Sequence, residues 1–150
     1  MTWPPTALAA ACLAGLLATT GCATTAEERA VYREDAVSAL EAGLGEARAA
    51  EMAGTQWVMG RSTGPFARVV VGESESSLSA EAGWFGGVQP PTPAEDPVRQ
   101  EALGALDEAS GAVADLRIAL ERADRAGTVR ALREVAAAAA TVEETAGAMR

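Results

Sequence analysis

The sequence predicts an all-α fold: a small three-helix bundle with a long irregular loop after its first helix. The prediction rests on two observations. In the C-terminal third, apolar residues recur at alternating steps of three and four, the spacing that places them on one buried helix face. Residues 55–95, by contrast, are rich in Gly, Pro and Ser and show no such stripe. The chain has 150 residues, which is enough for one domain.

The first helix is expected at about residues 24–53. Two overlapping Thr-x-x-Glu sequences, at 24–27 and 25–28, fit a capping box, in which the Thr oxygen and the Glu carboxylate bind free backbone N–H groups. Gly54 marks the expected end, because glycine readily adopts the left-handed conformation that closes many helices. The apolar stripe between these signals comprises Tyr32, Val37, Leu40, Leu44 and Ala47.

The segment 55–95 is expected to be an irregular loop. Residues 56–59 and 66–71 are β-prone runs on either side of a turn-like stretch at 60–65. A short β-hairpin is therefore an alternative for this part, although a two-stranded ribbon needs the helices for support. A loop of this length is usually either functional or disordered.

The last third predicts an antiparallel helical hairpin, with helices at about 97–124 and 128–148. Asp96 followed by proline fits the N-cap and the first position of a helix. The Gly-Thr pair at 127–128 makes the connection so short that the two helices must be antiparallel neighbours. The two stripes comprise Ala102, Leu106, Ala109, Val113, Leu116, Leu120 and Ala123, and then Leu132, Val135, Ala139, Val142, Ala146 and Met149.

The composition excludes several classes of function. Arginine supplies all 12 basic residues against 21 acidic ones, and histidine is absent, so the net charge is −9. An acidic surface argues against a nucleic-acid partner and against electrostatic docking to anionic lipid. Without histidine most catalytic triads and cysteine–histidine metal sites cannot form, so no catalytic residue, metal site or dissociable cofactor is predicted.

Residues 1–21 form an uncharged apolar leader that is too short to span a membrane. The leader continues into Gly21 and Cys22 in a way that resembles the lipobox of bacterial lipoproteins. The resemblance implies a diacylglycerol on the Cys22 thiol, cleavage after Gly21, and a fatty acid such as palmitate on the new amino group. It implies a mature domain of residues 22–150, exported and lipid-anchored to the bacterial cell membrane or outer membrane. The alternatives are an ordinary leader cut near Ala23 and an Ala-rich helix in which the cysteine is incidental.

The expected function is that of a non-catalytic envelope protein that binds another protein. Trp57, Trp84 and Phe85 are the candidate partner-binding residues, because aromatic side chains on loops commonly anchor partners. The alternative for Trp84 and Phe85 is that their rings fill the seam of the bundle. Two other functions stay open. The same three aromatics would serve a small-molecule or glycan binding module. A carboxylate-based hydrolase is more remote, and would use Glu73, Glu75 or Glu81.

Overall fold

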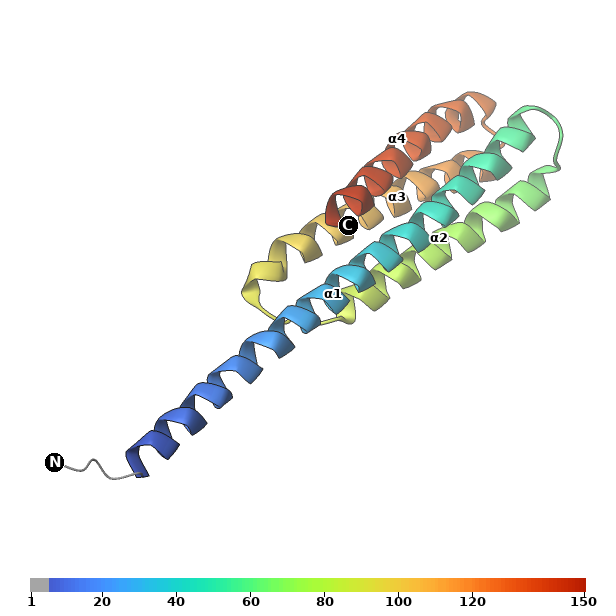
Figure 1. The fold of residues 1–150 in the computed structure, drawn as a ribbon. Helices are drawn as coiled ribbons and strands as arrows, with labels where there is room; N and C mark the ends of the chain where they lie inside the picture. The colour runs from blue at the N-terminus through green and yellow to red at the C-terminus, as the bar shows by residue number, and fades with distance from the viewer. Residues whose placement is uncertain (1–5) are drawn as a thin grey trace.

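The structure is a computed structural model that describes the backbone of residues 6–150 and the side chains of residues 25–150. Its secondary structure is entirely helical over these residues, which confirms the predicted all-α class (Figure 1). The elements are α1 (Thr6–Val58), α2 (Gly64–Gly87), the 3₁₀ helix η1 (Pro93–Glu95), α3 (Asp96–Glu121) and α4 (Arg125–Met149).

The predicted loop at 55–95 is wrong, because most of it is the helix α2, and the bundle has four long helices rather than three. The β-hairpin alternative is wrong for the same reason. Thr63 caps the start of α2, where its Oγ1 accepts the Phe66 N–H at 3.4 Å. Glycine and serine lower the helix propensity of this segment, but burial of one face outweighs that deficit. The buried residues follow a near-heptad spacing: Ala67, Val71, Ser74, Leu78 and Phe85.

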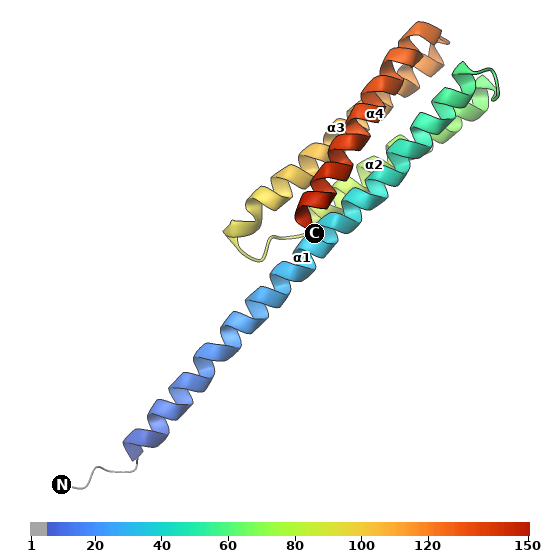
Figure 2. The ribbon, with the colours of Figure 1, turned by 45° about the horizontal axis from the view of Figure 1, so that its top comes forward.

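The four helices alternate in direction around a common core (Figures 1 and 2). The α1–α2 turn and the α3–α4 turn lie together at one end of the bundle, here called the turn end. The connection from α2 through η1 to α3 lies at the opposite end with the C-terminus, here called the linker end. The N-terminal part of α1 projects beyond the linker end (Figure 2). Among the described residues, no helix combines the length and the apolar character that crossing a membrane requires.

The core is built largely from alanine. Fourteen buried alanines line the four long helices, and the larger buried side chains are distributed among them. Small side chains let helix backbones approach closely, so dispersion contacts replace part of the area that large side chains would bury. The large, fully buried side chains are Phe85, Leu40, Leu78, Leu106, Leu116, Leu120, Val71, Val113, Val135 and Val142.

Two glycines of α1 allow the closest approaches. A Cβ atom at Gly43 would collide with Leu106 of α3 and lie 3.3 Å from Leu78 of α2. A Cβ atom at Gly54 would lie 3.0 Å from Leu132 and 3.2 Å from Leu116. As a result α1 contacts α3 across the diagonal of the bundle, whereas α2 and α4 have at most marginal contact.

Arginines from neighbouring helices close the C-terminal ends of α1 and α2. Neither helix has a basic residue in its own last turn, where unpaired carbonyls carry partial negative charge. Arg125 of α4 donates to the Val58 carbonyl, and Arg99 of α3 donates to the Gly86 carbonyl. The C-terminal end of α1 is therefore held by α4, and that of α2 by α3.

The α3–α4 turn lies slightly earlier than the sequence predicts. Asp124 is the N-cap of α4, and its Oδ1 accepts the Gly127 N–H at 2.9 Å. A Cβ atom at Gly127 would collide with the Asp124 carboxylate, so a larger residue there would displace the capping side chain. Thr128, the expected cap, lies inside α4 and donates its hydroxyl to the Asp124 carbonyl at 2.8 Å.

We expect Gly43→Leu to lower the free energy of unfolding by about 1–3 kcal/mol, because the added side chain overpacks the contact with Leu106. Gly45→Leu is the matched control, since nothing lies within 4 Å of a Cβ atom at Gly45. Both substitutions raise helix propensity equally, by less than about 1 kcal/mol. Urea unfolding followed by circular dichroism measures the difference. Equal stabilities for the two variants would contradict the close α1–α3 contact.

Candidate binding surfaces

The predicted aromatic residues do not form one surface. Phe85 is fully buried, and its ring centroid lies 5.4 Å from that of Tyr32 in the core. It is therefore not available to a partner while the bundle is closed. Trp84 is half-exposed beside it and lines a shallow depression between α1 and α2. Trp57 packs partly against the core at the turn end, beside Gly64 at the start of α2, so about 20 residues of α2, or about 30 Å, separate it from Trp84.

The three carboxylates considered for catalysis do not converge. Glu75 is bound to Arg117 of α3 at 2.5 Å, and Arg117 also reaches Glu121 at 2.7 Å. The hydrogen bond to Glu75, followed by that to Glu121, raises the pKa of Arg117, so its guanidinium stays charged. Glu73 and Glu81 lie on other parts of the α2 surface. The described residues hold no group of three or more acidic, cysteine or histidine side chains arranged to bind a metal.

Cys22 lies outside the residues whose side chains are described. The lipid attachment, the cleavage after Gly21 and the leader at 1–21 remain predictions from the sequence. The described side chains begin at Thr25, at the linker end of the bundle. Whatever surface lies at the linker end is therefore close to the predicted point of attachment.

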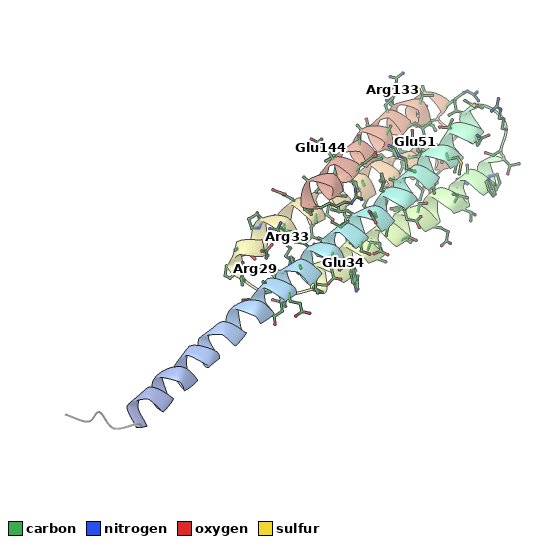
Figure 3. All side chains as sticks on the ribbon, in the orientation of Figure 1. Arg29, Arg33, Glu34, Glu51, Arg133 and Glu144 are labelled. Carbon is green, nitrogen blue, oxygen red and sulfur yellow. The ribbon has the colours of Figure 1, made fainter. Side chains whose placement is uncertain are left out.

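A buried carboxylate holds the linker, the connection from α2 through η1 to α3, in place against α1. Glu95 of η1 is only 3% exposed, and Arg33 of α1 donates its Nε–H to it at 3.1 Å. The Nε of Arg29, one turn earlier, lies 3.9 Å from the other carboxylate oxygen. Figure 3 labels both arginines on α1, beside the start of α3. Two half-exposed guanidinium groups thus compensate the burial of one carboxylate and hold the α2–α3 connection against α1.

An open groove of about 600 Å³ lies between α1 and the linker. Its lining combines apolar side chains with three carboxylates. No ion pair with another described residue neutralises the carboxylates of Glu27, Glu28 and Asp35. Such a groove suits a group that combines positive charge with apolar surface. The remaining lining residues are Val31, Tyr32, Val88, Gln89, Pro90 and Pro91.

Tyr32 stands between this groove and the core. It is 2% exposed, and its hydroxyl has no hydrogen-bond partner among the described residues. Burial raises the pKa of the Tyr32 hydroxyl, and the charges of Asp96 and Glu95 raise it further, while Arg99 opposes them. The hydroxyl is therefore held in its neutral form more firmly than in the unfolded chain.

The exposed apolar side chains gather on one half of the molecule. Among residues 25–150, the six large ones all lie on α1, on α2 or in the turn between them, and none lies on α3 or α4. Four of the six fall between residues 52 and 69. They are Met52, Met59, Phe66 and Val69 at the turn end, and Val31 and Trp84 near the linker end.

Charge is divided between the two ends of the bundle. Residues 52–72, here called the tip, contain Arg61 and Arg68 and no acidic residue, although the whole chain has a net charge of −9. Neither arginine forms an ion pair within the part of the chain that the structure describes. The net charge of the whole chain does not show that one stretch of it lacks acidic residues. A scan of charge along the sequence locates the acid-free stretch, but only the fold places it at the end of a rod.

No protein-family model, no curated protein and no solved structure matches this chain.

We expect Tyr32→Phe to be at least as stable as the unchanged protein at neutral pH, because the lost hydroxyl has no partner. The two proteins should then diverge in alkali. Above pH 10 the unfolded chain ionises Tyr32 while the folded protein retains the proton, so stability falls as pH rises toward the raised folded pKa. Urea midpoints at pH 9 and above measure this. An equal alkaline loss in Tyr32→Phe would show that another group is responsible.

Proposed function

We propose that this chain is an exported bacterial lipoprotein, anchored through lipid on Cys22, whose helical bundle binds another protein of the cell envelope and performs no catalysis. The resemblance of residues 18–22 to a lipobox supports the anchor. The restriction of exposed apolar side chains to α1 and α2 carries the proposal of a binding role.

The outer surface of α1 and α2, here called the α1–α2 face, differs in character from that of α3 and α4. Trp84 and Val31 are 50% and 52% exposed on it. The exposed side chains of α3 and α4 include many charged ones, such as Arg133 and Glu144, which point outward from α4 (Figure 3). Apolar side chains concentrated on one face of a soluble domain are typical of a protein interaction surface, and exposed tryptophan is a frequent anchor there.

Ion pairs join the helices of this face to the rest of the packed bundle. Arg117 joins α3 to α2 through Glu75, and Arg48 joins α1 to α4 through Glu143 at 3.6 Å. Arg150 pairs with Glu41, which fastens the end of the chain to α1. A surface that is already ordered loses little conformational entropy on binding, so a modest contact area suffices for recognition.

The linker-end groove favours a second candidate function, the binding of a small cationic molecule with an apolar part. Glu27, Glu28 and Asp35 would bind the charge, while Val31 and the prolines at 90–91 would contact the apolar part. Glycan stacking has less support, because Phe85 is buried and the two tryptophans are far apart. A carboxylate-based hydrolase has the least, because Glu75 is engaged by Arg117.

A photo-activated cross-linker placed at Val31 or Trp84 tests the interaction role in intact cells. We expect both positions to yield the same cross-linked protein, because both lie on the α1–α2 face. Matched positions at Arg133 and Glu144, on the outer side of α4, should yield none (Figure 3). Equal cross-linking from both faces, or no product from either, would refute an interface on α1 and α2.

Substitution of Cys22 tests the anchor. We expect Cys22→Ser to release the protein from the membrane fraction, because serine has no thiol to accept the diacylglycerol. Cys12→Ser is the matched control and should leave the protein in the membrane fraction, since Cys12 lies in the predicted leader. Fractionation with immunoblotting measures both. Retention of the Cys22→Ser protein would rule out lipid attachment at this residue.

A further inference from the structure

We propose that the tip is a docking site for a lipid surface that carries anionic headgroups. Together with the lipid anchor of the proposed function, on which this part rests, the tip would let the protein bridge two lipid surfaces. The proposal departs from the expectation that the acidity of the chain excludes anionic lipid. That expectation holds for a uniform surface, and the charge of this protein is not uniform.

Charge supplies the first argument. Arg61 and Arg68 are the only charged residues of the tip, and no acidic side chain lies between residues 52 and 72. Arg61 is exposed and Arg68 partly buried, and neither pairs with a described carboxylate. Basic residues near an anionic membrane surface each contribute about 1 kcal/mol to binding. The tip is therefore attracted to a surface that repels the acidic remainder of the bundle.

The apolar side chains supply the second argument. Met52, Met59, Phe66 and Val69 are each between 57% and 63% exposed, so they protrude. Met52 lies six residues before the end of α1, about 9 Å along its axis, and Val69 lies five residues after the start of α2, about 7.5 Å. All four therefore lie within the depth, about 5–10 Å, that interfacial helices reach between headgroups and acyl chains.

The rigidity of the turn supplies the third. Five residues join α1 to α2, and Gly60 takes the left-handed conformation there, with φ of 71°. Arg125 of α4 donates to the Val58 carbonyl and so holds the turn against the rest of the turn end. The apolar groups are thus presented on a fixed convex end. A bilayer accommodates protruding side chains without a matching pocket, which favours lipid over an acidic protein as the occupant.

The long axis of the bundle fixes the orientation. Thr25 and Val58 lie 33 residues apart along α1, which corresponds to about 50 Å. A molecule lying flat would bring its acidic sides against the anionic surface. A molecule standing on its turn end brings Arg61 and Arg68 there, together with the α3–α4 turn, where residues 121–125 hold two acidic and two basic residues. The anchored end and the docking end are then opposite ends of one rod. The second lipid surface would lie about 50 Å from the anchored end of the bundle.

The test uses the full lipidated protein reconstituted into phosphatidylcholine vesicles. These are mixed with labelled vesicles made of phosphatidylcholine and phosphatidylglycerol in equal amounts, or of phosphatidylcholine alone. Energy transfer between the two vesicle populations reports bridging. We expect bridging only with the anionic vesicles, weakened by added salt. Phe66→Ser should reduce the apparent affinity about tenfold, because the apolar contribution of its ring is lost.

The decisive comparison is between two double variants. Arg61→Gln with Arg68→Gln should weaken bridging about 25-fold, which corresponds to about fivefold for each arginine. Arg48→Gln with Arg150→Gln removes the same charge from exposed ion pairs outside the tip and should change bridging less than twofold. Circular dichroism checks that both variants are folded. Equal effects of the two pairs, or equal bridging of neutral vesicles, would overturn the proposal.

Two further outcomes separate this proposal from the proposed function. If the protein floats with its own vesicles but bridges nothing, the anchor stands and the docking site is wrong. If the protein does not float with neutral vesicles, the anchor is wrong. In that case the docking site is tested by co-flotation of the protein with anionic vesicles, and the two double variants are compared in the same way. Loss of binding with the tip variant alone supports it, and any other result refutes it.

Discussion

The close approach of helices through alanine and glycine is the constraint on which this structure depends. Ala36, Gly43, Ala47 and Gly54 line one face of α1, and the leucines of α3 and α4 lie against it. Such a core buries little area per residue, so its stability depends on close contact along the full helix length. The position of each helix along its axis therefore matters more than in a bundle packed with large side chains.

Arginine fixes those axial positions. Arg99 and Arg125 bind the carboxyl ends of α2 and α1, Arg117 joins α2 to α3, and Arg33 holds the buried carboxylate of Glu95. Each of these contacts is made at a helix end or between neighbouring helices, where a slip along the axis would break it. Arg61 and Arg68 at the tip form no ion pair with a described carboxylate, so they do not fix helix positions in this way. This contrast gives the two ends of the bundle different surfaces.

The predictions from sequence differ in outcome because their signals differ in strength. Helices α3 and α4 were expected within a few residues of their observed bounds, because their apolar stripes are long and unbroken. Helix α2 was missed because its glycines, serines and β-branched valines suggest loop or strand when each is considered alone. Its buried positions, such as Val71, Leu78 and Phe85, acquire a common direction only when α1 and α3 cover them. In this segment, burial against α1 and α3 outweighs the low intrinsic helix propensity.

The sequence by itself determined the helical class, the strong periodicity of the C-terminal half and the lipobox resemblance at Cys22, because each is a pattern among residues close together in the chain. Only the tertiary structure decided that Phe85 is buried while Trp84 is exposed, and that Glu95 lies beneath Arg33. It also decided that residues 52–72 lie at the turn end of the bundle, opposite the predicted anchor. These features depend on which distant segments meet, and neither composition nor net charge contains that information.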